Sequence, residues 1–455
     1  VTEKIEVKKK VYENIIPFLK DDSILTSNTS GIPIAELSDS FTDDLKSRFM
    51  ITHFFNPPRY MHLLELVRGK ETSEETYTKI TEFGEAVLGK GIVHAKDTPN
   101  FIGNRIGVFG MMTAVNLATE YGLTVEEVDS LTGTISGRPK SATFRTADIV
   151  GLDTLHNVSQ TTYQKAIEDE EREIFKTSKI LEQLIESGRL GQKSKKGFYR
   201  KNEDKTIDSV NLETGQYQPK NKVRFDCFRL AKGRQRLGSR LTALCYADDR
   251  GSKYFWQLTS KTLIYSANRI PHISDDIVNI DNAMKWGFGW EAGPFEIWDL
   301  IGVKQSTEKM KSNGEKVPKW VQLMLDMGRS TFYATKDGIL NYWCPKKKKV
   351  IDTRESPKVL NLVLHKSKGN IIKQDLSASL NDLGDGILNV EFHSILQPRL
   401  HPIDSSYISM INSALDLVEN NKYKGIVIGH QGANFCAGAN LNLLLELSRS
   451  KQWDA

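Results

Sequence analysis

Hydrophobic and polar positions alternate between helical and strand patterns over residues 1–96. Residues 1–19 (VTEKIEVKKKVYENIIPFL) predict an amphipathic helix whose apolar side chains lie at positions 5, 11, 15, 16 and 19. Four short apolar runs rich in β-branched and aromatic residues then predict buried strands. These runs are SILTSN (23–28), MITHFF (50–55), LLELV (63–67) and IVHAK (92–96). Together they predict the second half of an open α/β sheet.

Beyond this sheet the pattern becomes helical, and the predicted fold class is α/β plus all-α. A helical domain is expected over 97–200, and the polar, turn-rich stretch that follows predicts a linker and connecting segment over 201–254. A second helical domain is expected over 255–345. Residues 356–455 return to strand and helix alternation, which predicts a further α/β domain.

An internal repeat links the two helical regions. NRIGVF (104–109) leads to Asp129 and then ADIVGLD (147–153), while NRIPHI (268–273) leads to Asp281 and then WDLIGV (298–303). The acidic residues of each copy, Asp129 with Asp148 and Asp281 with Asp299, stand 19 and 18 residues apart. This order predicts two copies of one helical unit packed on each other.

Composition and charge narrow the class of protein. The chain has 455 residues, 39% of them hydrophobic and 26% charged, which is typical of a globular protein of about two to four domains. Its longest apolar runs are too short to cross a membrane, and no nucleic-acid partner is expected. The four cysteines are scattered without a C-x-x-C pair, which favours the cytoplasm and disfavours a disulfide framework or metal site. The net charge of +5 suits an anionic ligand or a solvated surface equally well.

His53 and Glu65 are the first candidates for chemistry. Glu65 stands alone among apolar residues in a predicted strand, where a carboxylate is costly unless it is paired. A buried pair with His53 would fix the imidazole tautomer and raise its basicity, as a general base requires. The alternatives are that His53 is an ordinary core histidine beside Phe54 and Phe55, and that Glu65 binds a backbone amide.

Ser30 and Asn104 are the second pair of candidates. Both side chains can hydrogen-bond a neutral or developing negative oxygen, as the oxidation of a secondary alcohol to a ketone requires. Each also has a simpler interpretation, because Ser30 can cap a turn or helix and Asn104 can cap the helix that follows it.

Four motifs, taken in order, resemble the 3-hydroxyacyl-CoA dehydrogenases of fatty-acid β-oxidation. They are SNTS (27–30), HFFNPP (53–58), LLELVRG (63–69) and DTPNFIGNR (97–105), and the resemblance extends to about residue 345 through WGFGWEAGPFEIWDLIG (286–302). It implies (S)-3-hydroxyacyl-CoA as substrate, NAD as cofactor and His53 as the base that removes the 3-hydroxyl proton. Glu65 would be the partner of His53, and Ser30 and Asn104 would contact the substrate oxygen.

The same resemblance implies the C-terminal half of a Rossmann-like NAD domain followed by two repeated helical dehydrogenase C-terminal domains. Glu3, Lys8 and Asn28 fall where the family approaches the nicotinamide half of NAD. No G-x-G-x-x-G occurs in the sequence, so we expect the phosphate-binding half to precede Val1. We therefore expect this chain alone to bind NAD poorly.

The last segment resembles the opening of an enoyl-CoA hydratase, or crotonase, domain. The motifs are LGDGILNVEFHS (383–394) and GIVIGHQGANFCAGANL (425–441). In that family the backbone N–H after the Ala-Gly pair polarises the thioester carbonyl, which here implies the amide of Ala439. The chain departs from the families' patterns at 233–240 and 395–401.

The order of the two segments implies a bifunctional hydratase and dehydrogenase, for which a homodimer or a thiolase partner is conceivable. One alternative is a catalytically inactive acyl-CoA-binding or assembly module that lacks a complete NAD site. Another is an NAD-linked reductase of hydroxy acids without CoA, which the crotonase-like tail disfavours.

Overall fold

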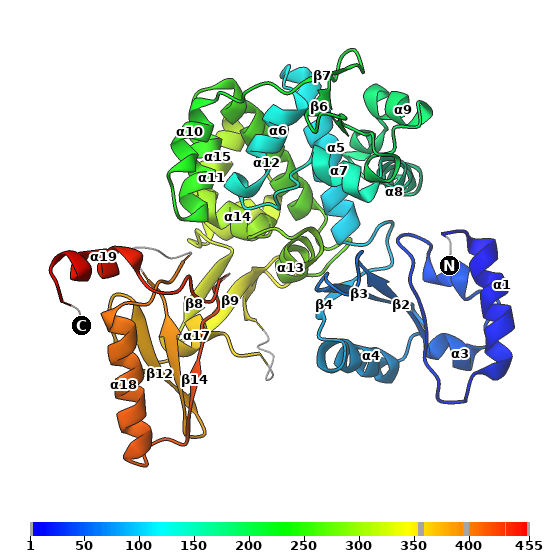
Figure 1. Cartoon of the computed structure of the whole chain (residues 1–455). Coiled ribbons are helices and arrows are strands. Elements are labelled where there is room, and N and C mark those ends of the chain that lie inside the picture. The colour runs from blue at the N-terminus through cyan, green and yellow to red at the C-terminus, as the bar shows by residue number, and fades with distance from the viewer. Residues whose placement is uncertain (1–2, 354–358, 395–399, 433, 453–455) are drawn as a thin grey trace. The chain divides into compact units, whose positions relative to one another are not determined.

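Two units make up the chain in a computed structural model, which describes residues 3–353, 359–394, 400–432 and 434–452 (Figure 1). The first unit comprises residues 1–333 and 343–350, and the second comprises residues 334–342 and 351–455. Within the described ranges, no helix is long and apolar enough to cross a membrane.

A four-stranded sheet in the order β1-β2-β3-β4 forms the N-terminal part of the first unit. Its strands are β1 (Leu25–Ser27), β2 (Phe49–Phe54), β3 (Leu63–Arg68) and β4 (Gly91–Ala95), which confirms the four predicted strands. The sheet is mixed, because β1 and β2 are parallel, β3 returns antiparallel to β2, and β4 is parallel to β3. The connection over 55–62 is too short for the crossover that a parallel β3 would need.

The two faces of this sheet have different roles. Met50, Leu64 and Leu66 lie on one face, where Tyr77 and Ile80 of helix α4 (Glu74–Ala86) pack against them. Because side chains alternate along a strand, the residues between these positions point to the opposite face. That opposite face presents His53 from β2 and Glu65 from β3.

Helix α1 (Ile5–Ile15) forms as predicted, but its buried face differs from the expected one. Lys8 and Tyr12 are buried, whereas Ile5 and Val11 are partly exposed. The Tyr12 ring packs edge-on against Phe41 and Phe49, and its hydroxyl donates to Ser27 at 2.7 Å. These tertiary contacts, which the helical pattern does not contain, decide the orientation. Short helices α2 (Ile34–Leu37) and α3 (Asp43–Ser47) follow.

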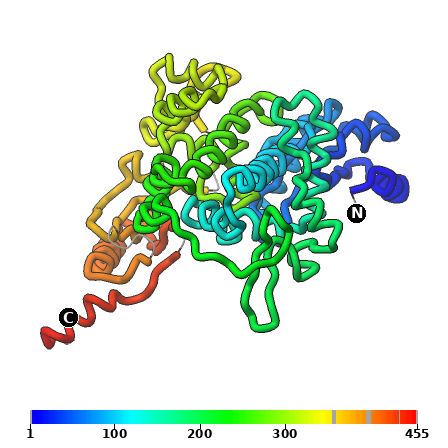
Figure 2. The backbone as a smooth tube through the Cα atoms, turned by 90° about the horizontal axis from the view of Figure 1, so that it is seen from above, coloured from blue at the N-terminus to red at the C-terminus, as the bar shows by residue number. Residues whose placement is uncertain are grey.

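Two successive groups of helices complete the first unit (Figure 1, Figure 2). The first group is α5 (Gly103–Glu120), α6 (Val125–Leu131), α7 (Phe144–Val150), α8 (Leu152–Lys165) and α9 (Lys179–Glu186). The second group is α10 (Asp226–Lys232), α11 (Leu237–Tyr246), α12 (Arg250–Asn268), α13 (Ile277–Phe288), α14 (Pro294–Ile301), α15 (Val303–Ser312) and α16 (Lys319–Asp326). Helix α12 packs against α5, so the two groups share one core.

The interval 201–254, predicted as a linker and connecting segment, contains regular structure. Strands β5 (Tyr199–Lys201), β6 (Ile207–Val210) and β7 (Tyr217–Pro219) form an antiparallel sheet, and helices α10 and α11 precede α12. Glu126 of α6 holds this sheet, since it accepts hydrogen bonds from the Ser209 hydroxyl at 2.8 Å and the Asn221 amide at 2.6 Å. The polar pattern looks like a linker because this small sheet is anchored mainly by hydrogen bonds.

The departure at 233–240 joins α10 to α11 and contains a buried arginine. Arg240 donates to the carbonyl of Ile135 at 3.0 Å and forms an ion pair with Glu291 at 3.1 Å. The other departure, 395–401, lies mostly outside the described residues.

The repeat has a different alignment from the one predicted from the Asn-Arg-Ile motifs. Residues 104–106 lie in the first turn of α5, whereas 268–270 lie at the end of α12, so these motifs are not equivalent in space. The carboxylates do correspond, because Asp129 lies in α6 and Asp281 lies in α13, each preceding a short helix that it caps. Three-residue motifs recur easily by chance, while a buried carboxylate requires specific partners.

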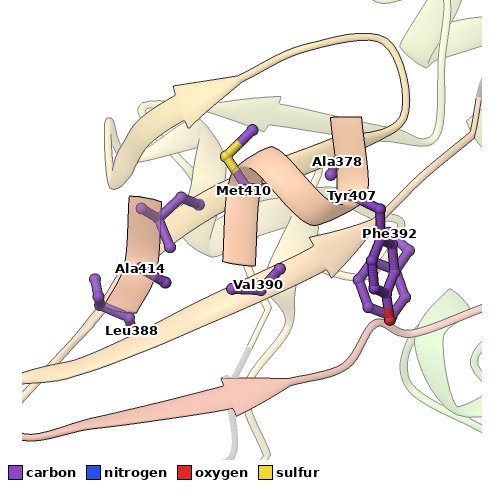
Figure 3. Packing of buried hydrophobic residues seen from close by; sticks show 8 residues of the cluster. Ala378, Leu388, Val390, Phe392, Tyr407, Met410 and Ala414 are labelled. Atoms are coloured by element: carbon purple, nitrogen blue, oxygen red, sulfur yellow. The ribbon is translucent and has the colours of Figure 1, made fainter. Parts of the chain in front are cut away.

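The second unit is built on a sheet in the order β11-β12-β13-β14. Its elements are α17 (Leu362–Ser367), β11 (Ile371–Gln374), β12 (Ala378–Gly384), β13 (Ile387–Phe392), α18 (Ser405–Glu419), β14 (Gly425–Ile428) and α19 (Leu441–Arg449). Helix α18 places Tyr407, Met410 and Ala414 against Leu388 and Val390 of β13 (Figure 3). Strands β8 (Tyr333–Lys336), β9 (Ile339–Cys344) and β10 (Lys349–Asp352) form a further sheet through which the division between the units runs.

Candidate active site

His53 and Glu65 are cross-strand neighbours. The antiparallel register of β2 and β3 pairs these two residues directly, which places both side chains on the same face of the sheet. His53 Nδ1 lies 2.6 Å from Glu65 Oε2, and both residues are buried, with Glu65 fully so. The predicted pairing therefore exists in the structure, and it results from the short turn that makes β3 antiparallel.

The Glu65 carboxylate is satisfied on both oxygens. Its Oε1 accepts hydrogen bonds from the amides of Ile102 at 3.1 Å and Gly103 at 2.8 Å, which lie at the N-terminus of α5. A helix N-terminus presents unpaired N–H groups and a partial positive charge, so it stabilises an ionised carboxylate. The simpler interpretation of Glu65, a carboxylate that binds backbone amides, is thus true at the same time as its pairing with His53.

These contacts determine the tautomer of His53. An ionised carboxylate can only accept, so Nδ1 carries a proton and donates it to Glu65. The other ring nitrogen, Nε2, is then an acceptor in the neutral imidazole, and it lies 3.1 Å from Ser30 Oγ. A neutral imidazole whose Nε2 accepts from a hydroxyl is the form that can remove a proton from a bound alcohol.

Ser30 lies in the loop that follows β1, at the carboxyl ends of the parallel strands β1 and β2. Glu3 holds this loop, because its carboxylate accepts from the Ser30 amide at 2.8 Å and from the Thr29 hydroxyl. In open α/β sheets the carboxyl ends of parallel strands are the usual ligand-binding edge. Ser30 is therefore positioned both by its hydrogen bond to His53 and by the fold of the sheet.

The residues predicted on the cofactor side, Glu3, Lys8 and Asn28, form one cluster beside Ser30. The buried Lys8 amine donates to the Asn28 carbonyl at 2.9 Å and lies 3.6 Å from the Glu3 carboxylate. Asn28 Oδ1 accepts from the Phe54 amide at 3.0 Å. This cluster ties α1, the loop after β1 and the end of β2 together next to His53.

Asn104 occupies the second residue of α5, directly after the Gly103 amide that binds Glu65. Its side chain is half-buried, and no described residue shares a hydrogen bond with it. A carboxamide with donors to spare can bind a ligand oxygen. Ser30, His53 and Glu65 thus form one hydrogen-bonded chain. This chain ends at the backbone amides of α5, and Asn104 lies in the first turn of that helix.

Two phenylalanines flank the imidazole and a third packs behind one of them, and sequence analysis did not identify these rings as part of the site. The rings of Phe55 and Phe101 pack edge-on against His53, with centroids 4.9 and 5.4 Å away. Phe288, at the end of α13, packs edge-on against Phe55 at 6.0 Å. Glycines make room for these rings, since a Cβ on Gly103 would lie 2.6 Å from Phe55. The glycine positions within α5 were the available signal, because glycine inside a helix is unfavourable without a packing reason.

A buried network fixes the start of α5. The Asp169 carboxylate accepts hydrogen bonds from Arg105 and from the Tyr265 hydroxyl at 2.7 Å, and it lies 3.1 Å from Arg269. Arg105 directly follows Asn104, so this network holds the helix turn that contacts Glu65. It also joins both groups of helices to the site, because Arg105 belongs to α5 whereas Tyr265 and Arg269 belong to α12 and its end.

Two parts of the chain match models of one protein family. Residues 1–98 match the model of the 3-hydroxyacyl-CoA dehydrogenase NAD-binding domain, and residues 101–201 match the model of the C-terminal domain of the same family. Over these residues the chain belongs to the 3-hydroxyacyl-CoA dehydrogenase family, whose members are NAD-dependent oxidoreductases. The Rossmann-like and helical domains expected from the sequence are thereby confirmed.

Individual relatives match a larger part of the chain. A Bacillus subtilis (strain 168) protein named "Probable 3-hydroxyacyl-CoA dehydrogenase" is 45% identical over 98% of this chain and 55% of its own length. A Rickettsia prowazekii (strain Madrid E) protein, whose name describes a fatty acid oxidation complex trifunctional enzyme, is 29% identical over 98% of this chain and 57% of its own length. The chain thus spans about half the length of these curated relatives.

One solved structure shares the fold. The crystal structure of 3-hydroxybutyryl-CoA dehydrogenase from Escherichia coli K12 matches with a TM-score of 0.51 and 19% identity. The match covers 72% of this chain and 81% of that chain, which extends the shared fold beyond the two matched family models.

Proposed function

We propose that the chain belongs to an enzyme that oxidises (S)-3-hydroxyacyl-CoA to 3-ketoacyl-CoA with NAD in fatty-acid β-oxidation. The observation that carries this proposal is the hydrogen-bonded chain from Ser30 through His53 to Glu65 and the amides of α5. In this chain Nδ1 faces Glu65, which stabilises the positive charge that His53 acquires, and Nε2 faces the Ser30 hydroxyl, whose place at this nitrogen a substrate hydroxyl can take.

In the proposed reaction, His53 Nε2 removes the proton of the 3-hydroxyl group and Glu65 stabilises the resulting imidazolium. Ser30 and Asn104 donate hydrogen bonds to the substrate oxygen as it becomes a carbonyl, and this interaction fixes the reacting carbon. Phe55, Phe101 and Phe288 keep water away from the imidazole, which strengthens each polar contact in the site.

The Glu3, Lys8 and Asn28 cluster fits the nicotinamide end of NAD. It lies at the carboxyl ends of the parallel strands, beside Ser30, and the Asn28 amide group has hydrogen-bonding capacity left after its oxygen accepts from Phe54. NAD, when bound, supplies the acceptor for the hydride that leaves the 3-carbon. The residues of this chain hold and orient the substrate alcohol next to that position.

The test of the proposal is His53→Gln, assayed by NADH formation from a 3-hydroxyacyl-CoA in a preparation that contains the complete enzyme. Loss of the base is expected to lower kcat by about 10²–10⁴-fold while the Kd for 3-ketoacyl-CoA stays nearly constant. His62→Gln is the matched control, because His62 is exposed and packs against Trp286 instead of the site. An unchanged rate in His53→Gln would contradict the assignment.

The second unit supports a further part of the proposal, namely a crotonase-like site that binds the thioester of the same acyl-CoA. Ala439 is exposed and directly precedes Asn440, the N-cap of α19. Among the described residues, no acceptor takes a hydrogen bond from its amide, so this N–H remains available to a thioester carbonyl. Truncating the chain after Val350, which keeps all of the first unit, should then weaken the binding of acyl-CoA thioesters, as calorimetry can measure.

A multi-enzyme setting, including a thiolase partner or a homodimer, belongs to the same proposal. Its support is the name of the Rickettsia prowazekii relative, which describes a trifunctional enzyme of a fatty acid oxidation complex. Co-purification of the complete protein with thiolase activity, lost at high salt, is the expected result.

A further inference from the structure

The turn that joins β4 to α5 contains two consecutive residues in the left-handed region of backbone conformation. Asn100 has a φ of 63° and Phe101 has a φ of 48°. Asparagine adopts this region more readily than most residues other than glycine, but a bulky aromatic residue rarely does so. Such a conformation persists only when the surrounding structure holds it, and it is found most often at functional sites. The contacts around this turn must therefore keep it in place.

The turn positions three groups of the candidate site. The Phe101 ring, which is fully buried, packs edge-on against His53. The next two backbone amides, those of Ile102 and Gly103, both donate to Oε1 of Glu65. Successive amides in a turn of this kind converge on an anionic oxygen. The left-handed pair thus sets the direction from which α5 approaches the His53–Glu65 pair.

The Asn100 carboxamide anchors the turn to helix α8. Asn100 is 1% exposed, and its Nδ2 donates to the carbonyl of Val158 at 2.8 Å and to the hydroxyl of Thr162. Both acceptors lie on α8, 58 and 62 residues further along the chain. A carboxamide nitrogen has two hydrogens to donate, so both are used on one helix. The side chain therefore has a fixed direction, away from the reacting groups and toward α8.

Helix α8 also supports the loop that carries Ser30. Lys165, the last residue of α8, donates to the carbonyl of Gly31 at 3.3 Å. A Cβ on Gly31 would lie 3.5 Å from both the backbone nitrogen and Oδ1 of Asn100. Asn100 therefore packs between α8 and the residue that follows Ser30. The same residue thus adjoins the supports of both ends of the hydrogen-bonded chain that runs from Ser30 to Glu65.

We infer that Asn100 is a positioning residue of the candidate site. Its carboxamide, fixed on α8, holds the left-handed turn that directs two amides at Glu65 and the Phe101 ring at His53. Asn100 acts through these neighbours, because its own side chain is directed at α8. The inference rests on the proposed function and adds to it a dependence of the rate on a helix that lies outside the hydrogen-bonded chain.

The test is Asn100→Gly in the complete enzyme, because glycine adopts the left-handed conformation freely and the substitution removes only the anchor. We expect kcat for the oxidation of one 3-hydroxyacyl-CoA to fall by about tenfold to a hundredfold, since a small displacement of the base is sufficient for such a loss. The Kd for 3-ketoacyl-CoA, measured by calorimetry, should stay nearly constant. A role in stability alone would lower the unfolding temperature without changing kcat of the folded enzyme.

Thr162→Val and Ser159→Ala form a matched pair on α8, and both side chains are buried. The Thr162 hydroxyl accepts from Asn100. The Ser159 hydroxyl instead donates to the Phe175 carbonyl at 2.6 Å, in the segment that follows α8. Each substitution removes one buried hydrogen bond, so both should lower the unfolding temperature. Only Thr162→Val should also lower kcat, by a smaller factor than Asn100→Gly.

A kcat of Asn100→Gly equal to that of the unmodified enzyme would overturn the inference and leave the proposed function intact. Equal losses of kcat in Thr162→Val and Ser159→Ala would also overturn it, because the effect would then follow from destabilisation of α8. If Asn100→Gly does not fold, the pair on α8 decides alone. Absence of NAD-dependent oxidation of 3-hydroxyacyl-CoA by the unmodified complete enzyme would overturn the proposed function and the inference together.

Discussion

Each of the two groups of helices contains a pair of aspartates, and the two pairs make matching hydrogen bonds. In the first group, Asp129 accepts from the Tyr199 hydroxyl at 2.8 Å, and Asp148 accepts from the amides of Phe198 and Tyr199 at 2.8 and 2.9 Å. In the second group, Asp281 accepts from the Tyr333 hydroxyl at 2.8 Å, and Asp299 accepts from the amides of Phe332 and Tyr333 at 2.7 and 2.9 Å. One carboxylate holds the tyrosine hydroxyl and the other holds its backbone.

What differs is the helix by which each group reaches the site. In the first group, α5 starts at the candidate site, where its amides bind Glu65. In the second group, α13 packs against β3 and β4 and brings Phe288 to the aromatic enclosure of His53. The first group therefore contributes the helix N-terminus that binds Glu65, and the second group contributes an aromatic ring that covers the site. The difference arises because only the first group has a helix N-terminus at the site.

The largest expected effect is on kcat, and it distinguishes the two Asn-Arg-Ile motifs. Asn104→Ala removes a proposed donor to the substrate oxygen and should lower kcat by about 10²–10³-fold. Asn268→Ala changes the same motif at the end of α12 and should leave kcat nearly unchanged. Steady-state assays of both variants with one 3-hydroxyacyl-CoA provide the measurement. Equal losses in the two variants would mean that the motifs act alike, against the structural alignment.

Two glycines of α5 test the covering role of α13. A Cβ on Gly107 would lie 2.0 Å from the Phe288 ring, so Gly107→Ala should displace this ring and lower kcat/KM by about tenfold to a hundredfold. A Cβ on Gly110 would meet its nearest neighbour only at 3.8 Å, so Gly110→Ala should fit and stabilise the helix by up to about 1 kcal/mol. Activity and thermal unfolding of both variants decide the matter, and a harmless Gly107→Ala would count against the role of Phe288.

Tyr199 and Tyr333, which hold corresponding positions in the two groups, should contribute similar amounts to the free energy of unfolding. Tyr199→Phe and Tyr333→Phe each remove one donor from a buried carboxylate, and each should lower the free energy of unfolding by about 1–3 kcal/mol. Chemical denaturation of the two variants gives these values. A loss confined to one variant would show that the two copies are not equivalent in stability, even though their hydrogen bonds match.

The smallest expected effect is a shared pH dependence. Burial raises the pKa of Asp148 and of Asp299 to about 6, above the value of about 3.9 for an unfolded aspartate. Each group therefore stabilises the fold most below about pH 4, and this contribution is lost as the pH rises through about 6. Asp148→Asn and Asp299→Asn should both reduce the fall in unfolding free energy between about pH 4.5 and 7, as measured by urea denaturation. An unaltered slope in either variant would argue against a raised pKa at that position.

Much of the site is predictable from sequence, because its signals are local. Glu65 in an apolar strand demands a partner, and His53 is near enough in the chain to be that partner across the short connection 55–62. Ser30 and Asn104 follow from motif resemblance, and their roles stay predictions. Phe288 and Asp169 could not be assigned in this way, since each reaches the site from a distant segment through packing and buried charge.

The sequence by itself determined the four strands of the first sheet, the helical character that follows and the family to which residues 1–201 belong, because apolar periodicity and short motifs are properties of contiguous residues. Only the tertiary structure decided which face of α1 is buried, that residues 201–254 hold a small sheet and two helices, and how the repeat aligns. It also packed Phe288 of α13 against Phe55, which lies next to His53. Those outcomes depend on contacts between residues far apart in the chain, whose energies no local pattern contains.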